Sequence, residues 1–384
     1  MTVNYPLASD TWNEKEIEAI NRVIASNRFS MGNEVAAFER EFADYFGSKY
    51  AVMVNSGSSA NLIGVAAVVL SEKYGLSKGD EVIVPAVSWA TTYTPLHQYG
   101  LKLRFVDVDM GTLNINLDNL EEAITDEAKA VFAVNLLGNP NEFDRLKAIC
   151  EKNKLILMED NCESMGAKYK GKYTGTFGVF GTFSTFYSHH MATMEGGIIL
   201  TDDDELYDIM VSIRSHGWTR NISKESKLNT STDEFYNLFN FVLPGYNVRP
   251  IEMEAAIGRE QLKKLEGFLE NRRKNGKYFE ELVAGKSNIS TQRNVDESSY
   301  FGFPILFNSP EERTKVVKLF GKLNIECRPI VAGNFTRNEV IKFFHYSIYG
   351  GLENSDKVHD CGLFIGNHHF ECCEQIKTIM DLIK

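Results

Sequence analysis

Short runs of apolar and β-branched residues alternate with helix-like stretches through the first two-thirds of the chain. The runs that predict strands are residues 50–54, 81–84, 103–106, 130–134, 155–159, 181–186 and 197–200. Stretches between them, such as residues 58–74 and 144–153, have the pattern of helices. Strands that are apolar at nearly every position and alternate with helices are typical of a mainly parallel sheet covered by helices. The pattern therefore predicts an α/β fold.

The pattern changes near residue 250. Residues 250–275 predict one long amphipathic helix with many charged positions, and after it a strand (303–307), a helix (310–323) and a short extended segment (326–329) follow. This restart predicts a large α/β domain over residues 1–254 and a smaller α+β domain over residues 255–384. A length of 384 residues also favours two domains over one core.

The composition narrows the classes of function. Hydrophobic residues at 43% and charged residues at 24% describe a globular chain, not a disordered or collagen-like one. The net charge of −11 disfavours a nucleic-acid-binding protein, which needs a basic surface. We see no secretory signal at the start, and no apolar run approaches the ~20 residues that span a membrane. Neither nucleic acid nor a membrane is therefore an expected partner.

The six cysteines form no Cys-x-x-Cys pair. Free thiols in a reducing cytoplasm are the simplest interpretation. No cysteine occurs between Cys162 and Cys327, so the spacing predicts no iron–sulfur cluster, and we expect no metal site.

Three motifs carry candidate chemistry. The first, Asn55-Ser-Gly-Ser-Ser-Ala60, follows a predicted strand and opens a predicted helix. Gly57 allows a tight turn there, and the hydroxyls of Ser58 and Ser59 lie beside the free N–H groups of the helix start, an arrangement that binds phosphate. A serine that merely caps a buried helix is the alternative.

The second motif, Met158-Glu-Asp-Asn-Cys-Glu163, ends an apolar strand. Ligands of open α/β sheets bind at the carboxyl ends of strands, and a carboxylate such as Asp160 can hold the protonated nitrogen of a pyridine ring there. Aspartate is also a common turn residue, which is the alternative interpretation.

The third motif is Ser184-Thr-Phe-Tyr-Ser-His-His-Met-Ala-Thr-Met-Glu-Gly-Gly197. In this order, the three motifs resemble the DegT/DnrJ/EryC1/StrS family of sugar aminotransferases, and the resemblance extends over the whole chain. It implies the fold of aspartate aminotransferase (fold type I) and the cofactor pyridoxal 5′-phosphate or pyridoxamine 5′-phosphate. The family's cofactor-binding lysine falls here on His189, and no lysine occurs between Lys172 and Lys224. This exchange resembles the sugar 3-dehydratases of the family.

The resemblance also implies roles for individual residues. Gly57, Ser58 and Ser184 would hold the cofactor phosphate, Asp160 the ring nitrogen, and Trp89 would stack on the ring. Asn247 would reach the phosphate of a neighbouring subunit's cofactor, which implies a homodimer with shared active sites. Glu163 would lie near the cofactor. The candidate contacts to the substrate are Phe29, His216, Arg220 and Arg328.

Histidine in place of lysine changes the expected reaction. Lysine binds the cofactor aldehyde covalently and also moves protons, whereas imidazole can only move protons. The resemblance therefore implies a non-covalent cofactor, His189 as acid and base, and glutamate as the amine donor that renews the cofactor. The implied reaction removes the C3 hydroxyl of a nucleotide-linked 4-keto-6-deoxy sugar, with GDP-4-keto-6-deoxy-D-mannose as the preferred candidate.

Other functions remain open at this point. The nucleotide could be CDP or dTDP, the reaction could be a sugar transamination, or the chain could be a catalytically inactive regulatory protein on the same fold. The implied 3,6-dideoxysugar of the colitose type points to O-antigen and lipopolysaccharide biosynthesis.

Overall fold

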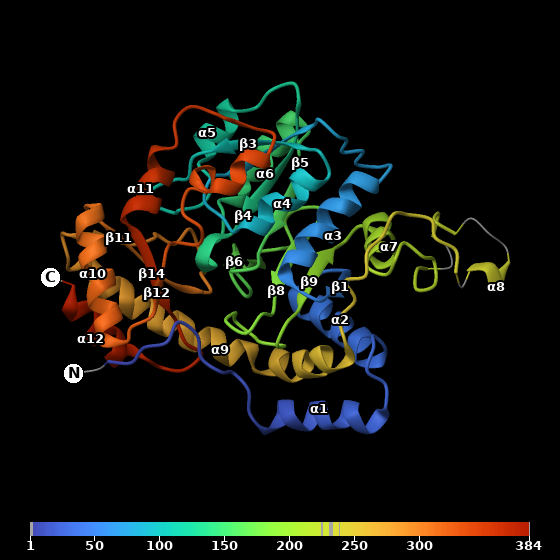
Figure 1. Ribbon diagram of the computed structural model, residues 1–384, viewed down its shortest axis with the longest axis horizontal. Helices are drawn as coiled ribbons and strands as arrows, with labels where there is room; N and C mark the ends of the chain where they lie inside the picture. Colours follow the sequence, from blue (N-terminus) through green and yellow to red (C-terminus); the bar gives the residue numbers. More distant parts are fainter. Residues whose placement is uncertain (1–2, 224–225, 230–232, 238, 384) are drawn as a thin grey trace.

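An eight-stranded sheet forms the centre of the computed structural model, which describes residues 3–223, 226–229, 233–237 and 239–383 (Figure 1). In spatial order its strands are β1 (Tyr50–Val54), β9 (Gly197–Thr201), β8 (Gly181–Ser184), β5 (Ile156–Asp160), β4 (Ala128–Val134), β2 (Glu81–Pro85), β3 (Lys102–Val106) and β13 (Tyr346–Ile348). β9 runs antiparallel to both of its neighbours, and the other neighbouring strands pair in parallel. The carboxyl ends of seven strands therefore meet at one edge of the sheet. The predicted α/β class with a mainly parallel sheet is confirmed.

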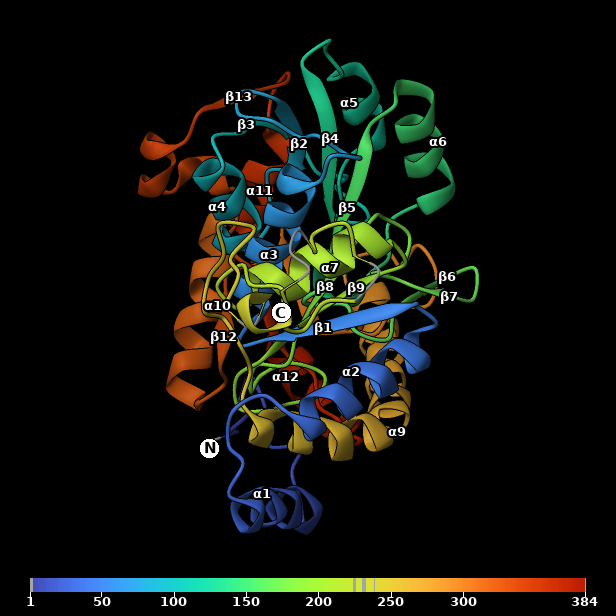
Figure 2. The same cartoon turned by 90° about the vertical axis from the view of Figure 1, so that its right-hand side faces the viewer.

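Helices cover both faces of this sheet. The helices of this part of the chain are α1 (Glu14–Ser26), α2 (Asn33–Phe46), α3 (Gly57–Leu70), α4 (Ala90–Gln98), α5 (Leu117–Glu122), α6 (Phe143–Asn153), α7 (Asp204–Ile213), α8 (Glu234–Asn237) and α9 (Glu252–Ala284). Side chains of α3, α4 and α7 pack on one face, and those of α2, α5, α6 and α9 pack on the other. In both views α1, α2 and α9 lie on the same side of β1 (Figures 1 and 2).

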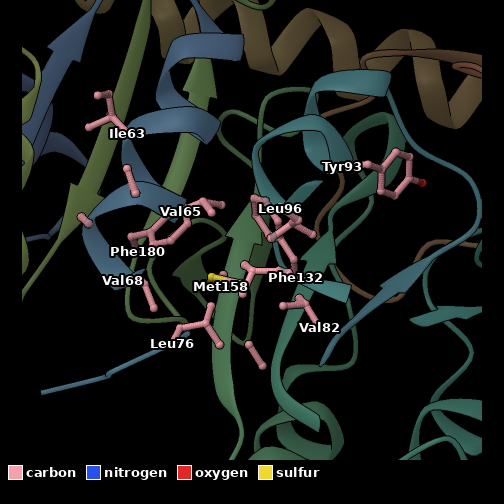
Figure 3. Close-up of a cluster of buried hydrophobic side chains, with 14 of the residues drawn as sticks. Ile63, Val65, Val68, Leu76, Val82, Tyr93, Leu96, Phe132, Met158 and Phe180 are labelled. Atoms are coloured by element: carbon pink, nitrogen blue, oxygen red, sulfur yellow. The ribbon is translucent and has the colours of Figure 1, made fainter. Parts of the chain in front are cut away.

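Alternation along the strands divides the core between the two faces. In β1, Val52 and Val54 point into the cluster under α3, whereas Ala51 and Met53 point into the cluster under α2 and α9. The cluster under α3 and α4 is drawn in Figure 3, where Val65 of α3 and Met158 of β5 are among the labelled side chains. Burial on both faces explains why these strands are apolar at nearly every position.

Two predicted elements end earlier than expected. The predicted helix 58–74 ends at Leu70, because the hydroxyl of Ser71 accepts hydrogen bonds from the backbone N–H groups of Lys73 (3.1 Å) and Tyr74 (3.3 Å) and forms a turn. The predicted strand 181–186 ends at Ser184 because the chain turns at Phe186, whose carbonyl accepts from the backbone N–H of His189 at 2.9 Å. This turn brings His189 to the edge where the parallel strands end.

A second, antiparallel sheet lies in the C-terminal part. Its order is β10 (Ile289–Ser290), β11 (Gly302–Phe307), β14 (Gly362–Gly366) and β12 (Cys327–Arg328), with the helices α10 (Pro310–Leu323), α11 (Glu353–Cys361) and α12 (Cys373–Leu382) around it. The remaining short elements are β6 (Lys168–Tyr169), β7 (Lys172–Tyr173), η1 (Leu136–Gly138), η2 (Phe335–Arg337) and η3 (Glu339–Phe343).

The chain crosses between the two sheets more than once. The long helix α9 packs on α1 and α2 with its first half and places Phe279 and Val283 in the core of the small sheet (Figure 1). Tyr5, near the start of the chain, is buried in that same core, and β13 returns to the edge of the large sheet. A division at residues 254 and 255 stays a prediction, since both parts of the chain contribute to both cores.

No helix within the described ranges is both long and apolar enough to cross a membrane. The six cysteines are free thiols.

Candidate active site

A cavity of about 280 Å³ lies at the carboxyl ends of the parallel strands. Its walls come from β5, β8 and the start of α3, and from residues that follow α9 in the chain, among them Phe301, Arg328 and Phe364. Eight of the residues singled out in the sequence line this cavity: Gly57, Ser58, Trp89, Asp160, Glu163, Ser184, His189 and Arg328. Positions far apart in the sequence therefore meet in one place.

The start of α3 forms one end of the cavity. Ser56 caps the helix by accepting a hydrogen bond from the backbone N–H of Ser59 at 3.0 Å. A Cβ on Gly57 would lie 2.6 Å from Cβ of Ser184, so this position has room for glycine only. The backbone of Gly57, the hydroxyls of Ser58 and Ser184 and the positive end of the helix dipole thus converge, which suits a phosphate group.

One hydroxyl of the first motif has a different role from the one expected. The Ser59 hydroxyl donates to Oδ1 of Asn55 at 2.6 Å and does not line the cavity. Asn55 is the last residue before the helix cap, so this bond stabilises the turn from β1 into α3. Ser59 therefore shapes the loop, and Ser58 is the serine that faces the cavity.

Asp160 is held by hydrogen bonds from several elements. Its carboxylate accepts from Nδ2 of Asn61 (2.8 Å), the hydroxyl of Thr92 (2.7 Å) and the backbone N–H of Cys162 (3.1 Å). It is 5% exposed and still reaches the cavity wall, so it can meet a ring nitrogen there. Asn61 and Thr92 were missed in the sequence, although Asn61 stands one helical turn after Gly57 and this spacing could have indicated it.

His189 lines the cavity, and none of the described residues that line it is a lysine. Burial, with a smaller contribution from the positive charge of Arg272, lowers the pKa of His189 to about 4. This pKa lies below the ordinary value of ~6.5 for histidine, because the cavity disfavours the charged imidazolium. A neutral imidazole is the form that accepts a proton at neutral pH, and once protonated it gives the proton away readily.

Glu163 stands beside Asp160 and His189 in the cavity. One of its carboxylate oxygens accepts a hydrogen bond from the backbone N–H of Leu137 at 3.2 Å. Burial raises the pKa of Glu163 to about 8, although this hydrogen bond acts in the opposite direction. A carboxyl group with this pKa carries a proton at neutral pH and can donate a hydrogen bond to a ligand.

Trp89 and Arg328 are the more exposed parts of the wall. Trp89 precedes the first turn of α4 and is 56% exposed, so its ring is open to a flat ligand. Arg328 comes from β12 of the small sheet and brings a positive charge to the wall of the cavity. An anionic substrate group can bind there.

The other four candidate residues do not line this cavity. Phe29 is 48% exposed near the start of α2, and the rings of His216 and Trp218 lie 5.3 Å apart. The guanidinium of Arg220 lies over the Trp218 ring at 4.2 Å, and Oδ1 of Asn247 accepts from Nε of Arg249 at 3.0 Å. Within one chain these residues lie outside the cavity, and their predicted contacts with cofactor or substrate stay predictions.

The residues present fit the cofactor that the resemblance implies. The cradle of Gly57 and Ser184 suits a phosphate, Asp160 suits a protonated ring nitrogen, and the Nδ1 atom of His189 is buried without a hydrogen-bond partner among the described residues. In the part of the chain that the structure describes, no cluster of three or more His, Cys, Asp or Glu side chains could hold a metal ion.

Comparisons with known proteins agree with this site. The model of the DegT/DnrJ/EryC1/StrS aminotransferase family matches residues 10–384. GDP-4-keto-6-deoxy-D-mannose 3-dehydratase of Yersinia pseudotuberculosis is 54% identical, over 100% of this chain and 98% of its own length.

Two solved structures of GDP-4-keto-6-deoxymannose-3-dehydratase have the same fold. One, with a trapped PLP-glutamate geminal diamine, has a TM-score of 0.97 and 52% identity over 99% of this chain and 100% of the other. The second is a histidine-to-asparagine variant with bound GDP-perosamine. It has a TM-score of 0.97 and 51% identity over 99% of this chain and 100% of the other. The chain belongs to the DegT/DnrJ/EryC1/StrS aminotransferase family.

Proposed function

We propose that this chain is a 3-dehydratase that depends on pyridoxal or pyridoxamine phosphate and removes the C3 hydroxyl of GDP-4-keto-6-deoxy-D-mannose. The observation that carries the proposal is the position of His189, which stands in the cavity at the place where the family's aminotransferases have lysine. The identity of 54% over the whole chain to a GDP-4-keto-6-deoxy-D-mannose 3-dehydratase supports the choice of substrate.

The cofactor is held without a covalent bond to the chain in this proposal. When bound, it supplies an amine that joins the sugar ketone and a ring that takes up an electron pair. The backbone of Gly57 with the hydroxyls of Ser58 and Ser184 binds its phosphate, Asp160 keeps its ring nitrogen protonated, and the Trp89 ring orients it by stacking. Glu163 donates a hydrogen bond to a cofactor or sugar oxygen.

His189 moves the proton that decides the reaction. As a neutral imidazole it accepts a proton from the C4′ carbon of the cofactor, and the imidazolium then protonates the oxygen that leaves C3 of the sugar. The low pKa of His189, about 4, makes the imidazolium a strong acid for this second step. An amide or an apolar side chain in this position could do neither.

Glutamate is the amine donor of the proposed reaction. Loss of the C3 hydroxyl reduces the sugar by two electrons, so an equal oxidation must occur elsewhere. Glutamate supplies it by becoming 2-oxoglutarate and ammonia, while the sugar becomes a 3,6-dideoxy-4-keto sugar. The related structure with a trapped PLP-glutamate geminal diamine supports glutamate as this donor. The product is a precursor of the colitose type in O-antigen and lipopolysaccharide biosynthesis.

A homodimer with shared active sites is part of the proposal. Asn247 lies outside the cavity of its own chain and pairs with Ser215, and three residues further along the chain Trp218 pairs with Phe241, whose side chain is exposed (57%). Such a surface suits burial against a second copy, from which Asn247 would reach the other cofactor's phosphate and Phe29, His216 and Arg220 the other substrate. The free thiols fit the reducing cytoplasm that we propose as its location.

A product assay tests the proposal. The protein is incubated with pyridoxal phosphate, glutamate and 4-keto-6-deoxy sugars linked to GDP, CDP or dTDP. We expect equal amounts of 2-oxoglutarate, ammonia and 3,6-dideoxy-4-keto product, with the GDP sugar preferred. An amino sugar that retains the nitrogen would identify an aminotransferase. A preference for the CDP or dTDP sugar would correct the identity of the substrate. Absence of both turnover and cofactor binding would point to an inactive regulatory protein.

A further inference from the structure

The imidazole of His189 packs against aromatic rings, and the backbone of Phe186 has only a minor effect on its pKa, opposite to that of burial. Histidines that exchange protons in active sites are usually fixed by a hydrogen bond from one ring nitrogen to a carboxylate or carbonyl. The Nδ1 atom of His189 is buried and has no such partner within the described ranges. The Phe301 ring meets the imidazole at 5.1 Å and 64°, and the Phe186 ring at 6.1 Å and 80°. Phe186 is 41% exposed, so Phe301 is the firmer support.

Phe301 belongs to a tightly held segment, residues 298–301. Its backbone N–H donates to the carbonyl of Leu137 at 3.0 Å, and that of Ser299 donates to the carbonyl of Gly138 at 2.9 Å. Tyr300 has a left-handed backbone (φ +45°), which a bulky residue rarely adopts. Such a conformation persists only where the surroundings enforce it, and it is frequent near functional sites.

Arg272 anchors this segment from α9. Its Nη1 atom donates to the carbonyls of Tyr300 (3.4 Å) and Phe301 (3.2 Å). Nδ2 of Asn367 donates to the same Tyr300 carbonyl at 2.9 Å and to the carbonyl of Arg272 at 3.1 Å. The guanidinium of Arg272 therefore fixes both Tyr300, which has the left-handed backbone, and Phe301, whose ring contacts His189.

The position of Arg272 is costly for stability. It is 4% exposed, its Nε has no hydrogen-bond partner, and its guanidinium has no ion-pair partner in the part of the chain that the structure describes. Burial lowers the pKa of Arg272 to about 10, so it stays charged at neutral pH. Arg259, on the same helix, shows the ordinary arrangement, with ion pairs to Glu34 (2.8 Å) and Glu41 (2.7 Å). A buried and unpaired charge points to a role other than stability.

We propose that Arg272 is a positioning residue for His189. It holds the carbonyls of Tyr300 and Phe301, and through them the Phe301 ring, against the imidazole. The effect on the reaction rests on the proposed function, whereas the contact with His189 does not depend on it.

The charge of Arg272 adds an electrostatic effect to this contact. It lowers the pKa of both His189 and His190, in each case as the second cause after burial. His190 lies behind the same ring, 5.7 Å from Phe301, and its Nε2 contacts the carbonyl of Ser299 at 3.1 Å. The charged and titratable groups that share the cavity with His189 are Asp160, Cys162, Glu163, Glu195 and Arg328.

Substitutions of Arg272 and Phe301 in the full-length protein test the proposal. The titration of His189 is followed by NMR without added cofactor, with its signal assigned from the His189→Asn variant. Arg272→Gln removes the charge and should raise the midpoint by about one pH unit or more. Arg272→Lys keeps the charge, so the midpoint of the His189 titration should be that of the parent protein. Phe301→Leu keeps the charge but removes the ring, so kcat with cofactor should fall about ten- to a hundredfold, with a smaller change in KM.

Arg259→Gln is the matched control, because it breaks ion pairs on the same helix without touching residues 298–301. It should lower the thermal midpoint and leave the His189 titration unchanged. A parent-like titration in folded Arg272→Gln, or a parent-like kcat in Phe301→Leu, would overturn the positioning role. If Arg272→Gln does not fold, the Phe301→Leu variant decides. A shifted titration in a protein without dehydratase activity would overturn the proposed function alone.

Discussion

Asp160 and His189 face the same cavity but are held in place by different means. Asp160 accepts hydrogen bonds from Asn61, Thr92 and the backbone of Cys162. His189 has an unpartnered Nδ1 among the described residues and is supported by the ring of Phe301. One wall of the cavity thus fixes a carboxylate with polar contacts, and the other fixes an imidazole with apolar ones.

The difference follows from what each group has to do. A carboxylate that pairs with a ring nitrogen keeps one charge state, and donors aimed at its oxygens stabilise that state. A histidine that accepts and returns a proton must not be stabilised strongly in its charged form. A carboxylate at Nδ1 would favour the imidazolium, whereas an aromatic ring orients the imidazole without this preference.

The largest effect should come from His189→Asn, which keeps the shape of the side chain but removes its basicity. We expect the rate of C3 dehydration to fall about 10²- to 10⁴-fold, the usual contribution of general acid–base catalysis. Binding of pyridoxal phosphate and of the sugar nucleotide should be retained, because the phosphate cradle is unchanged. Steady-state kinetics and a cofactor absorbance titration measure both.

His97→Asn serves as the control for this variant. His97 lies in the last turn of α4 and contacts Phe344 (ring centroids 4.7 Å apart), outside the cavity. It should turn over like the parent protein. A normal rate in His189→Asn would mean that another residue is the base, with His190 and His216 as the next candidates.

Much of the fold could be predicted from the sequence. Strand β1 and helix α10 begin and end where the pattern placed them, because each is a single apolar or amphipathic run between polar turns. Helix α9 extends to Ala284, nine residues beyond the predicted end at residue 275. Its last turns pack into the core of the small sheet, a tertiary contact that the local pattern does not contain.

The two walls of the cavity differ in how far the sequence predicted them. Gly57, Asp160, Ser184 and His189 belong to local motifs at strand ends, and the structure brings all of them together. Phe301 and Arg272 belong to no local motif. Phe301 contacts His189, and Arg272 binds the carbonyl of Phe301, only because segments far apart in the sequence pack together, so a single sequence could not indicate them.

The second prediction concerns the polar wall. Asp160→Asn should weaken cofactor binding and lower kcat about 10²- to 10³-fold, by analogy with the loss of one preorganised electrostatic group. Thr92→Val removes a single donor and should cost about 1.5–3 kcal/mol in cofactor affinity, the usual contribution of a hydrogen bond to a charged group. Absorbance titrations with pyridoxal phosphate measure both values. Parent-like affinity in both variants would contradict the role of this wall.

The third prediction tests the phosphate cradle. Gly57→Ala places a methyl group 2.6 Å from Cβ of Ser184, so it should weaken phosphate binding and destabilise the protein by about 1–3 kcal/mol. Gly267→Ala, in α9, meets no atom within 4 Å and should stabilise the protein by up to ~1 kcal/mol. Denaturant unfolding and the dissociation constant of pyridoxal phosphate are the measurements. Equal stability and equal affinity for pyridoxal phosphate in the two variants would mean that the space around Gly57 is wider than the structure shows.

The last effect should appear in the dependence of stability on pH. The pKa of His189 is about 4 in the folded protein and ~6.5 in an unfolded chain, so the unfolded chain binds more protons between these values. The contribution of His189 to stability is therefore complete above pH ~6.5 and is lost as the pH falls through the folded pKa of about 4. Asparagine does not titrate. The parent protein should consequently lose stability relative to the His189→Asn variant as the pH falls through this window. Glu163 and the other titrating groups are the same in both proteins, so their contributions cancel in the difference. Urea unfolding of the two proteins at several pH values gives this difference. A constant difference would show that the cavity does not lower the pKa of His189, and the contrast between the polar and the aromatic wall would then lose its electrostatic basis.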